Sequence, residues 1–170
     1  MEWDGKECYR LTHRTVKKIS GYATSLVPHY EPRQSQSTRC GVMCAQVGVC
    51  GFCMGGALSF IAAALCPEIS AAAPFYGIPP ASSGAGDDRL ARIRIPVQAH
   101  FGDRDDAVGF SSPAEYVPLG EKLVASGVPY EVFTYPAGHA FTNPTQPNFS
   151  ADCTRLAFGR LYAFMKKHLG

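Results

Sequence analysis

The feature that most constrains this chain is a glycine-rich stretch at residues 51–56, which reads Gly-Phe-Cys-Met-Gly-Gly. A short apolar run at residues 47–50 precedes this stretch, and a helical run at residues 55–66 follows it. Glycines on both sides of such a junction let the backbones of a strand and a helix approach closely. The stretch therefore predicts a sharp strand-to-helix turn with Cys53 at its tip.

A cysteine at the tip of such a turn is well placed to act as a nucleophile. The dipole of the following helix favours its thiolate over its thiol. The backbone N–H of Met54 would point at the same spot and could serve as an oxyanion donor. A purely structural alternative stays open, in which Gly55 and Gly56 only end a loop and Cys53 is a buried thiol.

A second alternative is a redox or zinc site built from the cysteines at positions 40–53. A redox pair needs both cysteines at a helix start, whereas Cys50 lies inside the predicted strand. A zinc site needs a further pair of ligands, and no histidine completes a tetrahedral set with Cys40 and Cys44. We therefore expect neither a metal nor a redox site here.

Apolar runs and helical runs alternate along the chain from position 46 onward. Strands are predicted at residues 47–50, 70–76, 95–101 and 130–135, and helices at residues 55–66, 113–126 and 150–168. This alternation is typical of an α/β protein with a parallel sheet flanked by helices. Residues 81–88 are expected to form a polar loop.

Two polar loops follow predicted strands downstream of Cys53. One contains Asp103, Asp105 and Asp106, and the other contains His139 between small residues. Parallel strands bring their carboxyl ends to one sheet edge, so both loops are expected beside Cys53. The order nucleophile, acid, histidine is the one that α/β-hydrolases use.

The other four histidines have less reason to belong to a site. His100 lies within a strand pattern and is expected to be a packed core residue, while His13, His29 and His168 are expected to be solvated. Any of the three aspartates could also merely cap a turn. Residue pattern alone does not choose among those aspartates.

Composition narrows the class of protein and its surroundings. The 170 residues suffice for one domain, and 46% hydrophobic against 18% charged residues indicate a globular chain. Residues 1–45 carry seven Lys and Arg against four Asp and Glu, while the rest is slightly acidic, so a nucleic-acid partner is disfavoured.

The apolar stretch 55–66 is too short to span a bilayer. Seven cysteines without a secretory signal indicate a reducing, cytoplasmic location.

Three motifs together resemble the dienelactone hydrolase (carboxymethylenebutenolidase) family of the α/β-hydrolase superfamily. The stretch around Cys53 matches that family's Gly-x-Cys-x-Gly-Gly turn, and Gly-Asp-Arg-Asp at 102–105 matches its Gly-x-x-Asp loop. Tyr-Pro-Ala-Gly-His-Ala-Phe at 135–141 matches its histidine loop. The resemblance covers about three-quarters of the chain and favours Asp105 over its neighbours.

The resemblance implies a hydrolase of small esters or lactones that needs no cofactor. Cys53 would attack the acyl carbon to give a thioester, His139 would transfer protons, and Asp105 would orient the imidazole, with the Met54 amide as oxyanion donor. The best-known members of the family bind a substrate carboxylate through an arginine a few residues after the histidine. Residues 141–144 read Phe-Thr-Asn-Pro, so dienelactone itself is a less favoured substrate.

The resemblance also implies that about half of the family's sheet precedes the Cys53 turn, including a second oxyanion donor. Residues 1–45 contain no recognisable counterpart, so we expect a poorly ordered or atypical segment there and a partial catalytic domain at 46–170, the C-terminal half of the fold. The first strand would then leave an open sheet edge, available for self-association. The alternative function is a non-catalytic remnant or binding module of the same fold without a complete oxyanion hole.

Overall fold

The computed structural model describes residues 47–80 and 89–170. Within these ranges the elements are β1 (Val47–Phe52), α2 (Met54–Leu65), β2 (Ile69–Phe75), the short 3₁₀ helix η2 (Leu90–Arg92), β3 (Val97–Gly102), α3 (Pro113–Ala125), β4 (Tyr130–Tyr135) and α4 (Ala151–Leu169). Each strand and helix predicted above is present, with ends that differ by at most two residues. The expectations for residues 1–45, for the loop at 81–88 and for His13 and His29 lie outside the described residues.

The four strands form one parallel sheet in the order β1-β2-β3-β4. This arrangement confirms the predicted α/β class. The register aligns the strand ends, since Phe52 pairs with Phe75 across β1 and β2, and Phe75 pairs with His100 across β2 and β3. Gly102 at the end of β3 pairs with Tyr135 at the end of β4. The loops that follow β1, β3 and β4 therefore leave the sheet at one edge.

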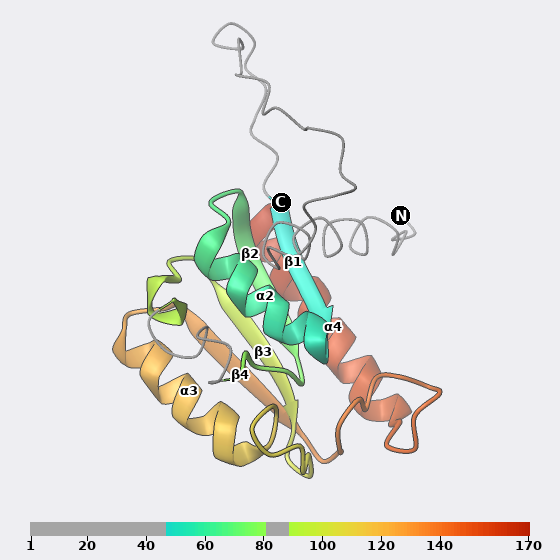
Figure 1. The fold of residues 1–170 in the computed structure, drawn as a ribbon. Helices are drawn as coiled ribbons and strands as arrows, with labels where there is room; N and C mark the ends of the chain where they lie inside the picture. The colour runs from blue at the N-terminus through green and yellow to red at the C-terminus, as the bar shows by residue number, and fades with distance from the viewer. Residues whose placement is uncertain (1–46, 81–88) are drawn as a thin grey trace, which may run out of the picture.

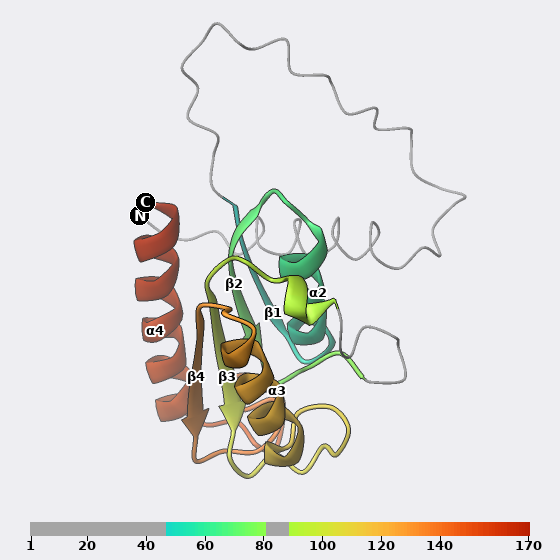
Figure 2. The same ribbon diagram turned by 90° about the vertical axis from the view of Figure 1, so that its left-hand side faces the viewer.

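The helices cover both faces of this sheet. Helices α2 and α3 lie on one face and α4 lies on the other, which gives three layers (Figures 1 and 2). Strand β3 shows how the alternating side chains build two cores: Val97, Ala99 and Phe101 pack towards α2 and α3. The intervening His100 stacks on Phe75, a residue of the α4-side core.

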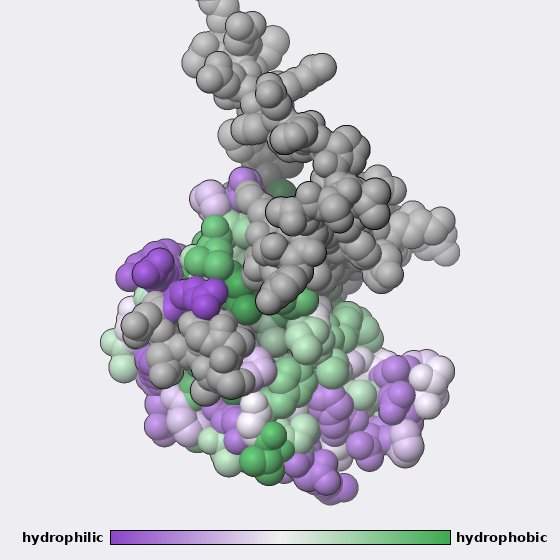
Figure 3. All heavy atoms as spheres, viewed as in Figure 1, coloured by the Kyte–Doolittle hydropathy of each residue, from purple (hydrophilic) through white to green (hydrophobic). Residues whose placement is uncertain are grey.

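Helix α2 contains no charged residue, and only its two ends are exposed. A helix that is apolar on nearly all sides is stable only when it is largely covered. In Figure 3 apolar residues gather over α2, in the middle of the face that carries it. Helix α2 packs on β1 and β2 beneath it and also contacts η2.

Strand β1 is at the edge of the sheet formed by the described residues. Whether this edge engages a second copy of the chain stays a prediction. Within residues 47–80 and 89–170, no helix has the length and apolarity to cross a membrane.

Candidate active site

Cys53 occupies the tight turn between β1 and α2 in a strained backbone conformation, with φ 54° and ψ −119°. Its N–H donates to the carbonyl of Phe75 at 3.0 Å, which ties the turn to β2. A Cβ on Gly56 would lie 2.3 Å from the same Phe75 oxygen, and one on Gly77 would lie 2.0 Å from the Cys53 oxygen. The turn therefore needs these glycines, and its side chain at Cys53 remains exposed.

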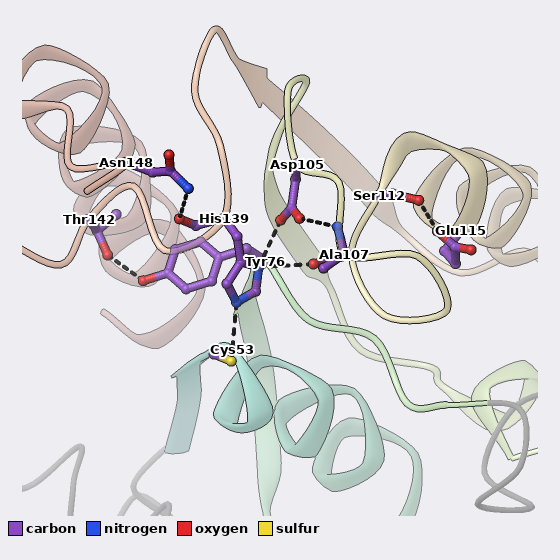
Figure 4. A network of polar contacts seen from close by, with 10 residues as sticks. Cys53, Tyr76, Asp105, Ala107, Ser112, Glu115, His139, Thr142 and Asn148 are labelled. Atoms are coloured by element: carbon purple, nitrogen blue, oxygen red, sulfur yellow. Dashed lines mark hydrogen bonds and ion pairs between the residues drawn. The ribbon is translucent and has the colours of Figure 1, made fainter. Parts of the chain in front are cut away.

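His139 brings Cys53 and Asp105 together at this sheet edge (Figure 4). Its Nε2 lies 3.2 Å from Sγ of Cys53, a residue 86 positions earlier in the chain. Its Nδ1 lies 2.8 Å from Oδ2 of Asp105. The three side chains that the sequence singled out thus form one continuous line of polar contacts.

Asp105 is the aspartate of its loop that contacts His139. Its side chain is fully buried, and its Oδ1 accepts a hydrogen bond from the N–H of Ala107 at 3.0 Å. Asp103 and Asp106 are exposed. A buried carboxylate with both oxygens in hydrogen bonds is held in one orientation, which in turn orients the imidazole.

The loop that carries His139 is fixed at several points. The amide of Asn148 donates to the His139 carbonyl at 3.2 Å, and Ala140 has a left-handed φ of 60°. The imidazole meets the ring of Tyr76 edge-on, with centroids 5.3 Å apart, and Phe110 lies 6.0 Å away. Tyr76 and Phe110 thus contact the ring, while Asn148 holds the backbone that carries it.

Sequence reasoning did not point to several of these neighbours. The Tyr76 hydroxyl lies 2.6 Å from Oγ1 of Thr142. Burial raises the pKa of Tyr76, and the nearby Cys53 adds to this although the bond to Thr142 opposes it. The phenol therefore stays neutral at physiological pH. Nothing in the residue pattern distinguished Tyr76, Phe110 or Asn148 from ordinary loop and core residues.

The expected oxyanion donor is at the first position of α2. Met54 begins this helix directly after Cys53. The first N–H groups of an α-helix have no partner inside the helix, so the Met54 amide is available to an oxygen near Sγ. The position of Met54 is thus compatible with the expected role of its amide as an oxyanion donor.

Among the described residues, the other histidines and cysteines lie away from this cluster. His100 is fully buried, as expected for a core residue, and contacts the Tyr135 hydroxyl through Nδ1 at 2.8 Å. His168, expected to be solvated, is half-buried and packs on Phe164. Cys50 is buried in the core beneath α4, whereas Cys53 is exposed beyond the strand end. In the described ranges no three His, Cys, Asp or Glu side chains gather as a metal site would require.

The sequence model of the dienelactone hydrolase family matches residues 9–169 of this chain. The chain belongs to the dienelactone hydrolase family. The match begins at residue 9. The resemblance carried by the three motifs begins later, at Val47. It includes the loops that carry Cys53, Asp105 and His139.

Relatives and solved structures agree with this membership. A carboxymethylenebutenolidase of Pseudomonas sp. (strain P51) is 31% identical over 124 residues, which are 71% of this chain and 48% of that protein. The crystal structure of a dienelactone hydrolase-like promiscuous phosphotriesterase from metagenomic libraries matches with a TM-score of 0.62 at 21% identity, covering 74% of this chain and 54% of that one. An α/β hydrolase enzyme from a deep-sea metagenome library matches with a TM-score of 0.53 at 15% identity, covering 72% and 54%. These structural matches show an α/β-hydrolase-like fold. The chain spans about half the length of the curated relatives it matches.

Proposed function

We propose that this protein hydrolyses small carboxylic esters or lactones through a covalent thioester on Cys53. The observation that carries this proposal is the line of contacts at His139, with 3.2 Å from Nε2 to Sγ and 2.8 Å from Nδ1 to the buried Asp105. A nucleophile within reach of a base, and a base oriented by a third group, is the arrangement that nucleophilic catalysis requires.

In the acylation step, Nε2 of His139 takes the proton of the Cys53 thiol. Sγ then forms a bond to the acyl carbon, and the carbonyl electrons move to the oxygen. The Met54 N–H donates to this oxyanion. When the tetrahedral intermediate collapses, the C–O bond breaks and the imidazolium gives its proton to the leaving alkoxide. In a lactone that alkoxide stays tethered to the acyl group.

In the deacylation step, His139 takes a proton from water and the hydroxide attacks the thioester carbon. The C–S bond then breaks, the acid product leaves, and the proton returns to the Cys53 sulfur. Asp105 remains ionised throughout and stabilises the imidazolium that forms twice in the cycle. The name of the Pseudomonas relative denotes a butenolidase, which supports lactones as one substrate class.

The test is to mix the protein with p-nitrophenyl acetate and follow intact mass and nitrophenol release together. We expect an acetyl adduct that maps to Cys53, appears early and clears as product accumulates. Cys53→Ala should remove both signals. Cys66→Ala is the matched control, because Cys66 lies at the far end of α2 and should leave both signals intact.

Two outcomes would contradict the proposal. Nitrophenol release at the wild-type rate by folded Cys53→Ala would mean that Cys53 is not the nucleophile. An adduct that persists without turnover would instead favour a remnant that keeps the nucleophile but cannot complete the reaction.

A further inference from the structure

We propose that Ser111 is a positioning residue for His139, supplying a second hydrogen-bond acceptor at Nδ1 beside Asp105. This inference rests on the proposed function, in which His139 is the base. The Ser111 Oγ lies 3.0 Å from Nδ1 of His139, and Oδ2 of Asp105 lies 2.8 Å from the same atom. Ser111 is fully buried, so this contact is not shared with bulk water.

The loop between β3 and α3 is folded so that Ala107 contacts both the Asp105 carboxylate and the Ser111 backbone amide. The Ala107 N–H donates to Oδ1 of Asp105 at 3.0 Å, and the Ala107 carbonyl accepts from the Ser111 N–H at 2.9 Å. Gly109, with a left-handed φ of 77°, lets the chain turn back between them. Asp105 and Ser111 are therefore held by the same turn and face His139 as a unit.

The chemistry at Nδ1 assigns the direction of the bond. An ionised carboxylate can only accept, so the ring must carry its proton on Nδ1 to pair with Asp105. Ser111 Oγ then also accepts from this N–H in a three-centre bond. Nε2 is left without a proton and faces Sγ of Cys53, which is the form that a base needs.

Two acceptors constrain the ring more than one does. A ring flip would put a carbon-bound hydrogen against both Asp105 and Ser111, and it would move Nε2 away from Sγ. When His139 takes the thiol proton, the ring becomes a cation and both oxygens stabilise it. The effect of Ser111 is therefore expected in the chemical step and not in substrate affinity.

Ser112 provides a matched control, because it is the next residue and is also buried, yet its hydroxyl contacts Glu115 instead of His139. Ser112, not Ser111, is the N-cap residue of α3. Ser111 precedes this position and lies outside the helix.

The experiment compares Ser111→Ala, Ser111→Thr and Ser112→Ala in the full chain with p-nitrophenyl acetate. We expect Ser111→Ala to lower kcat about tenfold with KM unchanged, the size of one hydrogen bond to a group that becomes charged. Ser111→Thr keeps the hydroxyl and should recover most of the loss, whereas Ser112→Ala should stay within about twofold of wild type. Equal kcat for Ser111→Ala and wild type would overturn the inference.

A second readout does not depend on turnover. In ¹⁵N-histidine-labelled protein we expect a proton bound at Nδ1 of His139, and several-fold faster exchange of this proton with water in Ser111→Ala. If wild type shows no esterase activity but this signature moves, the proposed function fails and the role of Ser111 stands. If Ser111→Thr folds like wild type yet exchanges as fast as Ser111→Ala, the hydroxyl is not the acceptor and the inference fails.

Discussion

The adjacent glycines at the start of α2 have different reasons to be glycine. A Cβ on Gly56 would lie 2.3 Å from the Phe75 carbonyl oxygen, which is backbone and cannot move aside. A Cβ on Gly55 would meet no heavy atom within 4 Å. Although both glycines occur in one motif, only Gly56 is required by close packing of the helix against β2.

We expect Gly56→Ala to lower the free energy of unfolding by roughly 1–3 kcal/mol, because the strand and helix must separate to admit a methyl group. Gly55→Ala is the control and should be neutral or stabilising by up to about 1 kcal/mol, since alanine favours the helix. Urea unfolding of the two variants measures both. Equal losses for the two would show that the clash does not govern Gly56.

Single residues also show where sequence reasoning was sufficient. Cys53 and His139 each lie in a motif with its own local signal, whereas the family resemblance was needed to favour Asp105 over its neighbours. The structure brings all three together. Ser111 had no such signal, because one of two consecutive serines before Pro113 reads as a helix cap. Only the path of the loop shows which serine faces the imidazole.

At the level of elements, β4 carries two tyrosines whose hydroxyl groups have opposite situations. The Tyr135 hydroxyl bonds Nδ1 of the buried His100 at 2.8 Å. The Tyr130 hydroxyl is buried and has no hydrogen-bond partner among the described residues. Burial raises the pKa of Tyr130 far above its usual value, so this phenol stays neutral. The Tyr130 ring packs on α3 at Gly120, and a Cβ on Gly120 would lie 3.0 Å from this ring.

Removing the Tyr130 hydroxyl and removing the Tyr135 hydroxyl should therefore affect the free energy of unfolding differently. Tyr130→Phe removes an unsatisfied polar group and should leave stability unchanged or raise it by up to about 1 kcal/mol. Tyr135→Phe leaves the buried His100 nitrogen without this partner and should cost roughly 1–3 kcal/mol. Thermal and urea unfolding of the pair measure the difference. A clear loss for Tyr130→Phe would mean that its hydroxyl has a partner after all.

For the molecule as a whole, His100 links the stability of the fold to pH. Burial, with a smaller contribution from the charge of Arg160 on α4, lowers the pKa of His100 to about 3. Its ring lies between Phe75 and Phe133, and its nitrogens contact Tyr135 and Gln98. The group is therefore neutral in the native state and gains a proton near pH 6.5 only when the chain unfolds.

This depressed pKa means that the contribution of His100 to stability is complete above about pH 6.5 and is lost as pH falls towards 3. The unfolded chain binds the extra proton in this window, so the free energy of unfolding should fall by about 1.4 kcal/mol per pH unit from this residue. His100→Asn removes the titrating group and should flatten the slope between pH 6 and 4.5. Urea unfolding across that range measures it, and parallel slopes in the two proteins would contradict the assignment.

The sequence by itself determined the alternation of strands and helices, the parallel class, and the turn at Cys53. These depend on neighbouring residues, through apolar periodicity and through glycines where two backbones nearly touch. Tertiary structure decided what no local pattern encodes: which serine meets Nδ1, which tyrosine partners His100, and that Nε2 lies 3.2 Å from Sγ across 86 positions. Such distances follow from strand register and from the folding of loops at one sheet edge, where packing of remote segments places each side chain.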